Sequence, residues 1–176
     1  MVELNVLMCE LKDYIDQNLV LSEVEESIFI SDISGKDITK SAEFSAKDAK
    51  NLEELIGELG ETFHEMLFRK IRESGLPETD VYKRANIDRK FFSKIRSNPA
   101  YHPRKGIVLA LAFALKLDLE ETAEFLEKAE YALSPGSKGD LIVKYCIEKN
   151  IYDLDSVNCM LYKFDQPLLG SCGKGR

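Results

Sequence analysis

The sequence predicts an all-α protein, in which five helices at the centre of the chain are joined by further helices at both ends. Two observations support this fold class. Apolar residues recur at steps of three and four along most of the chain, and helix-capping residues, Gly and Pro interrupt them at short intervals. We divide the chain into an N-terminal region (1–60), a central domain (61–133), a C-terminal helical pair (134–170) and a flexible tail (171–176).

The first predicted helix covers residues 3–19. Its apolar residues form a single stripe, because they are spaced by three or four positions: Leu4, Met8, Leu11, Ile15 and Leu19. Such a stripe either packs on the core of its own chain or forms the seam of a homodimer, and the sequence leaves both uses open. The N-terminal region is therefore a candidate dimerisation element.

The rest of the N-terminal region carries mixed signals. β-branched and aromatic residues lead up to a Ser-Gly turn, which allows a short β-hairpin near residues 27–40. Ser45 is a typical helix N-cap, so a further helix is expected from there towards Gly57 or Gly60.

In the central domain the helical signals are stronger. Five helices are expected there, over residues 63–74, 78–85, 89–97, 104–117 and 119–131. Asp88 and Asp118 precede the third and fifth of these helices and are expected to cap them. The fourth is apolar on nearly every side and should be the central helix of the core. After a Ser-Pro-Gly break at residues 134–136, two more helices are expected over residues 138–149 and 155–164.

Composition argues against several classes of protein. The longest apolar run, residues 106–115, is about half of what a membrane span requires, and the N-terminus shows neither a positive leader nor a small-residue cleavage site. No two of the four cysteines form a Cys-x-x-Cys pair, which argues against a structural zinc site. We therefore expect a cytoplasmic protein with reduced thiols that holds no metal and no cofactor.

A catalytic centre is hard to place on this chain. Its two histidines are His64, inside a predicted helix, and His102, in a loop flanked by proline. Neither has a nearby nucleophile together with a carboxylate that could orient it. We therefore expect a binding protein rather than an enzyme.

Charge is segregated along the chain. The whole chain carries a net charge of −7, which by itself argues against a general nucleic-acid-binding protein. Residues 81–105, however, hold eight Lys and Arg residues and one acidic residue, so this segment is at +7 and the remainder of the chain at −14. The basic residues are Lys83, Arg84, Arg89, Lys90, Lys94, Arg96, Arg104 and Lys105. A basic segment on an otherwise acidic protein favours a single anion-binding face.

Two short predicted helices joined by a tight turn form the basic segment, and this is the arrangement of a helix-turn-helix. Residues 76–98 read LPETDVYKRANIDRKFFSKIRSN, which matches the Xre or lambda-repressor-like helix-turn-helix pattern without a gap. The matching positions are the core of the second helix, the turn, the cap of the recognition helix and its apolar–Ser–x–apolar signature, held here by Val81, Ile87, Asp88, Phe92, Ser93 and Ile95. The chain resembles this family over residues 63–133.

The resemblance implies a five-helix lambda-repressor-like domain that binds double-stranded DNA as a homodimer, in the manner of bacterial transcription regulators. Arg89, Lys90, Ser93 and Lys94 fall on the side of the recognition helix opposite its apolar residues, and Arg89 is best suited to bidentate contact with guanine. Phosphate contacts are expected from the flanks of this helix. The remaining site residues are Lys83, Arg84, Arg96, Arg104, Lys105 and the cap Asp88.

A second resemblance covers residues 63–170, which end in DQPLLG. This stretch is similar to a module of poorly characterised bacterial proteins, some of which carry it after an enzymatic domain such as a macro domain. That resemblance implies a recognition module rather than a catalyst.

Several residues depart from the helix-turn-helix pattern, among them Ala85, which is small where the family is larger, and Arg96, which replaces a common acidic residue. Glu78 stands where many members carry a Gln that approaches a phosphate, Tyr82 where a small residue is usual, and Phe91 at a frequently polar position. Glu78, Phe91, the net acidity of the chain and its unexplained helical ends favour an alternative function, a protein-interaction module on the same scaffold with an apolar patch at Phe91 and no DNA binding. RNA binding is a further alternative, in which Tyr82, Phe91 and Tyr101 would stack on bases.

Overall fold

The structure, a computed structural model, describes residues 2–26 and 60–170. Every regular element in these residues is an α-helix, so the predicted all-α class is confirmed for them. The predicted hairpin near residues 27–40 and the predicted helix that begins after Ser45 lie outside the described residues, as does the predicted flexible tail (171–176).

The helices from residue 63 onward lie where the periodicity predicts them. In chain order the described helices are α1 (Val2–Glu26), α3 (Phe63–Ser74), α4 (Glu78–Arg84), α5 (Arg89–Ser97), α6 (Lys105–Leu115), α7 (Leu119–Lys128), α8 (Lys138–Glu148) and α9 (Leu154–Lys163). The prediction for α1 is too short, because this helix continues to Glu26 rather than ending at residue 19. Residues 19–26 contain no Gly or Pro, so the helix continues past the end of its apolar stripe.

Side-chain caps fix where several helices begin. Thr62 and Asp118 each form a reciprocal capping box with a Glu three residues later, at the starts of α3 and α7. Asp88 accepts a hydrogen bond from the Lys90 amide at 2.7 Å and begins α5. The predicted caps Asp88 and Asp118 are therefore confirmed.

Five of the described helices end in the same way. A residue other than Gly adopts the left-handed conformation just after α4, α6, α7, α8 and α9, and these residues are Asn86, Lys116, Glu130, Asn150 and Asp165. The amide that follows each of them donates to a carbonyl five positions earlier. Two examples are Ile87 to Tyr82 and Tyr131 to Leu126, both at 2.8 Å. Because a Cβ strains this conformation, each such end costs stability that Gly would not.

We expect Glu130→Gly to raise the free energy of unfolding by about 1 kcal/mol. Glu130 has φ of 59°, and its side chain, 85% exposed, has only a 3.8 Å contact with His102 to lose. The matched control is Glu127→Gly, the same substitution inside α7, which should lower the free energy of unfolding by about 1 kcal/mol. Urea unfolding followed by circular dichroism measures both. A decrease for Glu130→Gly would contradict the role assigned to backbone strain.

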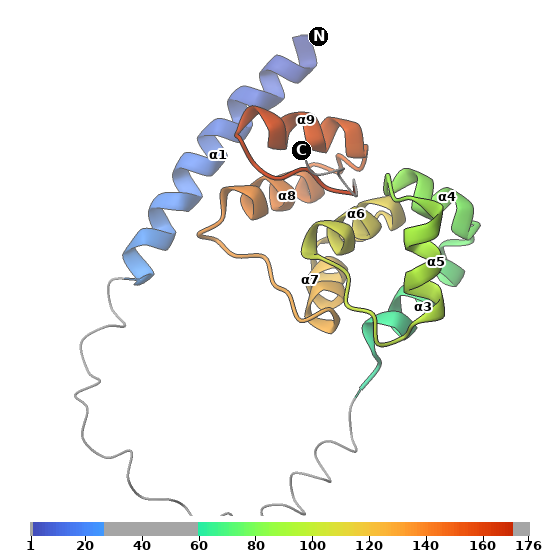
Figure 1. The fold of residues 1–176 in the computed structure, drawn as a ribbon. Helices are drawn as coiled ribbons and strands as arrows, with labels where there is room; N and C mark the ends of the chain where they lie inside the picture. Colours follow the sequence, from blue (N-terminus) through green and yellow to red (C-terminus); the bar gives the residue numbers. More distant parts are fainter. Residues whose placement is uncertain (1, 27–59, 171–176) are drawn as a thin grey trace, which may run out of the picture.

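Helix α6 is the centre of the core. Every residue from Ile107 to Leu115 is buried, as its apolar sequence predicts, and the helix packs against α3, α4, α7 and α9 (Figure 1). One continuous cluster of buried apolar residues joins these helices to α8. The C-terminal helical pair is therefore packed on the central helices through a shared core.

Helix α1 packs along α8 of its own chain (Figure 1). Leu11 and Ile15 are buried, and the Tyr14 ring lies 5.3 Å from the Tyr145 ring of α8. The Tyr145 hydroxyl also donates to the Leu7 carbonyl at 3.4 Å. The middle of the predicted apolar stripe therefore belongs to this chain's own core. In Figure 1, α1 lies at the opposite end of the molecule from α4 and α5.

The segment after α9, residues 165–170, folds back over the central helices, and we call it the strap. The Asn158 side chain of α9 accepts from the Leu169 amide at 2.8 Å and donates to the Leu169 carbonyl at 3.2 Å. A Cβ placed on Gly170 would lie 2.1 Å from the carbonyl oxygen of Ala85. Gly170 of the strap therefore packs closely against the end of α4, where the turn to α5 begins.

Candidate nucleic-acid interface

The packing of α5 determines which of its side chains reach solvent. Phe92 and Ile95 are buried beneath the helix. The Phe92 ring packs against Phe68 of α3 and Tyr82 of α4, with ring centres 6.2 Å and 5.5 Å apart. Because these contacts fix the rotation of the helix about its axis, the opposite side faces solvent. The exposed residues of that side, called the α5 face below, are Arg89, Lys90, Ser93 and Lys94.

The connection between α4 and α5 is tight. Ala85 is completely buried, Asn86 adopts the left-handed conformation with φ of 51°, and Ile87 is buried behind it. Tyr82, which occupies the position expected to be small, places its half-buried ring against Phe92 while α4 and α5 stay in contact. Its bulk is therefore accommodated within the packing of α4 and α5.

No ion pair among the described residues neutralises the cations of the α5 face. The Lys94 ammonium lies 4.3 Å from the centre of the Tyr101 ring, a favourable cation–π contact. Tyr101 in turn meets the ring of Phe91 edge-on, with centres 5.7 Å apart. Phe91 is half-buried by this arrangement, so the apolar patch expected at Phe91 for a protein partner is partly covered.

Arg96, an expected phosphate contact, is engaged within the protein. Its guanidinium pairs with Glu78 of α4 at 2.8 Å, and both side chains lie near the surface. The Glu78 carboxylate is thereby neutralised by a cation of α5. His64 donates from Nε2 to the Arg96 carbonyl at 3.1 Å and ties α3 to the last turn of α5. Arg96 therefore braces the two helices against each other.

Lys105, another expected phosphate contact, is also turned inward. Its ammonium pairs with Asp140 of α8 at 2.6 Å, and the Asp140 side chain is only 9% exposed. The same carboxylate accepts from the Ser134 amide at 2.8 Å. Lys105 therefore neutralises a buried carboxylate between α6 and α8, whereas its neighbour Arg104 is exposed.

We expect Lys105→Met to lower the free energy of unfolding by about 2 kcal/mol, because the Asp140 carboxylate would keep only the Ser134 amide as a partner. Arg104→Met is the matched control and should leave stability within about 0.5 kcal/mol, since its side chain is exposed and caps nothing. Chemical unfolding of both variants measures the difference. Equal stability of the two variants would contradict a structural role for Lys105.

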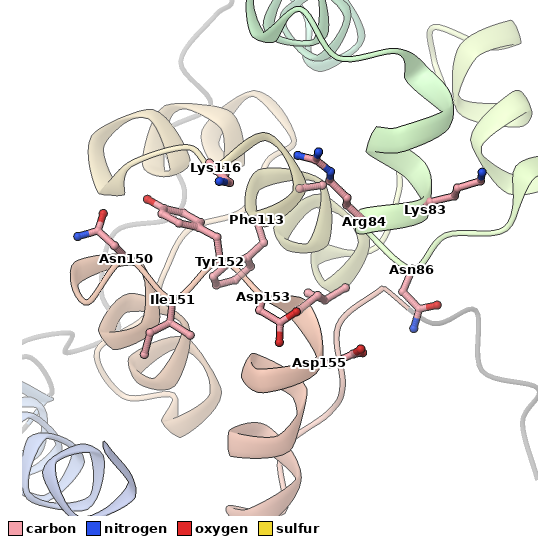
Figure 2. Close-up of a pocket in the computed structure, with 12 residues that line it drawn as sticks. Lys83, Arg84, Asn86, Phe113, Lys116, Asn150, Ile151, Tyr152, Asp153 and Asp155 are labelled. Carbon is pink, nitrogen blue, oxygen red and sulfur yellow. The ribbon is translucent and has the colours of Figure 1, made fainter. Parts of the chain in front are cut away.

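Lys83 and Arg84 do not join the α5 face. They line a cleft of about 740 Å³ together with Lys116, which follows α6, and with the connection between α8 and α9 (Figure 2). The full lining is Lys83, Arg84, Asn86, Phe113, Ala114, Lys116, Asn150, Ile151, Tyr152, Asp153, Leu154 and Asp155. Nine of the ten predicted site residues therefore divide into an α5 face, a cleft and a set engaged in capping or internal ion pairs, and the tenth, Arg104, is exposed outside these sets.

The aromatic residue of this cleft is held in place from behind. The Tyr152 hydroxyl donates to the Leu117 carbonyl at 3.1 Å, and its ring meets Phe113 edge-on with centres 6.2 Å apart. Burial, followed by the nearby charges of Asp118 and Glu121, raises the pKa of the Tyr152 hydroxyl. Tyr152 therefore stays a protonated, fixed wall of the cleft.

The sequence does not predict the structural roles of two residues, one in the cleft and one beside the α5 face. Lys116 lies outside the basic segment, and no pattern in the sequence brings it beside Arg84, because the fold alone does so. The sequence marks Tyr101 only as an aromatic residue near basic ones, whereas in the structure its ring contacts both the Lys94 ammonium and the Phe91 ring.

Among the described residues no group of three His, Cys, Asp or Glu side chains is placed to hold a metal ion. No described helix combines the length and the apolar character that crossing a bilayer requires. Comparison of the chain with models of protein families, with curated proteins and with solved structures gave no match.

Proposed function

We propose that the protein binds double-stranded DNA in a sequence-specific manner through the α5 face, as a regulator of transcription built on a repressor-like helix-turn-helix. One observation carries the proposal. Arg89, Lys90 and Lys94 stand together on the exposed side of a short, capped helix, and no internal ion pair of the described residues engages them. Cations kept free on one side of a rigid helix suit a polyanion of regular shape.

In this proposal α5 enters the major groove with its first turns. Arg89 offers two parallel donors to guanine, and Lys90 and Ser93 offer single donors to base edges or phosphates. Lys94, held over Tyr101, and the exposed Arg104 contact the DNA backbone. The acidic remainder of the chain repels DNA and restricts docking to this face.

The alternative function, a protein-interaction module, requires a different surface on α5. It needs an open apolar patch on α5, and the half-buried Phe91 against Tyr101 gives it little area. The large apolar side chains most exposed among the described residues are Val6, Tyr162 and Leu168, none of which lies on α4 or α5. We therefore favour DNA over a protein as the partner of this face.

Selection of binders from a random duplex library tests the proposed function. The unchanged protein should enrich one sequence motif. Arg89→Ala should lose the preference at one base pair of that motif, whereas Lys94→Ala should weaken binding to all sequences alike and keep the motif. A library that stays random after repeated selection would contradict sequence-specific binding.

Homodimerisation is the further part of this proposal, and it now rests on the two half-sites that helix-turn-helix proteins occupy. Leu11 and Ile15 are not available for a dimer seam while α1 packs on α8. We expect a palindromic motif in the selection and a dimer on DNA in sedimentation velocity. A monomer both alone and on its selected site would contradict this part.

A further inference from the structure

The cleft beside the end of α4 gathers cations that the α5 face does not use. Arg84 and Lys116 come from two different helix ends and lie on the same side of the cleft, whereas the Lys83 side chain, whose residue also lines the cleft, points away from them (Figure 2). None of them has an ion-pair partner among the described residues. The negative ends of α4 and α6 offset part of the repulsion between Arg84 and Lys116, but two like charges on one side of a cleft still favour an added anion.

The facing wall of the same cleft is acidic. Asp153 and Asp155 lie across from Arg84 and Lys116 in Figure 2, and no ion pair joins the two walls. One oxygen of Asp153 accepts from the amide and hydroxyl of Ser156 at 2.9 Å and 2.7 Å, which leaves its other oxygen free of any recorded partner. The Asp155 carboxylate has no recorded hydrogen bond among the described residues. The cleft therefore keeps opposite charges apart and both accessible.

The remaining lining groups are neutral and polar. Asn86 and Asn150 both follow helix ends in the left-handed conformation, and both are exposed residues that line the cleft. Their side-chain amides form no hydrogen bond with the described residues, so they are free to bind a ligand. Tyr152 is a fixed aromatic wall between the two charged sides (Figure 2). The volume of about 740 Å³ lies within the range of small-molecule sites.

We propose that this cleft binds a nucleotide. Its phosphates would be held by Arg84 and Lys116, and the hydroxyl and amino donors of its ribose and base would reach Asp153 and Asp155. Duplex DNA does not fit this chemistry, because the two carboxylates would face its phosphates. A bare phosphate would satisfy the cations and leave the acidic wall without a partner.

Isothermal titration with ATP tests the proposal on the full chain without DNA, so its outcome is independent of the proposed DNA binding. We expect ATP to bind at least about tenfold more weakly to Arg84→Ala/Lys116→Ala than to the unchanged protein. The matched control is Arg72→Ala/Lys163→Ala, which removes the same charge from exposed positions elsewhere and should bind ATP as the unchanged protein does. Thermal melts of both double variants show that each is folded.

Two further ligands test whether the cleft recognises a whole nucleotide rather than a nucleoside or a phosphate chain alone. Adenosine and inorganic tripolyphosphate should each bind more weakly than ATP, because each reaches only one of the two walls. In nuclear magnetic resonance spectra, ATP should shift the side-chain amides of Asn86 and Asn150. Equal ATP affinity of the two double variants, tripolyphosphate binding as tight as ATP, or shifts confined to the α5 face would each overturn the proposal.

Discussion

The triple substitution Arg89→Ala/Lys90→Ala/Lys94→Ala is expected to weaken binding to duplex DNA by about 100-fold or more. A bidentate contact of Arg89 with guanine contributes about 1–3 kcal/mol of discrimination, and each loss of about 1.4 kcal/mol is tenfold in affinity. The fold should survive, because the three side chains are exposed and have no recorded hydrogen bond or ion pair. Fluorescence anisotropy with a labelled duplex measures the change.

The control for net charge is Lys12→Ala/Lys138→Ala/Lys163→Ala. These lysines are exposed on α1, α8 and α9 and lie outside the α4–α5 pair, so the same loss of three charges should change DNA affinity by less than about threefold. If both triple variants lost affinity equally, binding would depend on overall charge and not on the α5 face.

Gly170→Ala is expected to lower the free energy of unfolding by about 3 kcal/mol, the largest effect on stability that we predict. Gly170 has φ of 79°, where an L side chain is strained by about 1–2 kcal/mol. The added Cβ would also lie 2.1 Å from the Ala85 carbonyl oxygen and 3.1 Å from the Leu154 side chain. Relieving this overlap costs about 1–3 kcal/mol more. The strap would have to leave α4, and the amide of Gly170 would lose the Gly106 carbonyl that it meets at 3.3 Å.

Gly136→Ala is the matched control for this substitution. Its Cβ would meet only the Ser134 hydroxyl, at 3.7 Å, which is ordinary contact, so stability should change by less than about 0.5 kcal/mol. Thermal unfolding of the two variants gives the comparison. If the Gly170→Ala variant were as stable as the Gly136→Ala variant, the close packing of the strap against α4 would be contradicted.

Local signals account for the parts of the fold that the sequence predicts. The caps Asp88 and Asp118, the apolar stretch of α6 and the Ser-Pro-Gly break before α8 all act within one or two turns of helix, and the helices begin and end near them. The end of α1 was predicted too early, because an apolar stripe reports which residues pack and not where a helix stops.

Long-range contacts account for the parts that the sequence does not predict. Lys105 and Arg96 belong to a basic segment, yet Asp140 and Glu78 approach them only in the folded chain. The two hydrogen bonds between the Asn158 side chain and the backbone of the strap cannot be predicted from the sequence either. No periodicity marks a side chain that pairs with the backbone of another segment. A count of charges in a segment therefore overstates how many of them reach a ligand.

The salt dependence of binding to random-sequence duplex DNA tests the central claim most directly. Arg89, Lys90 and Lys94 are exposed cations on α5, Arg104 is an exposed cation just before α6, and each phosphate that is neutralised adds about 0.9 to the magnitude of the slope of log affinity against log salt concentration. We predict that the unchanged protein binds at about 50 mM salt and that its affinity falls with a slope of about −3.6 per protomer. No binding at that concentration, or binding that salt does not weaken, would contradict a DNA-binding α5 face.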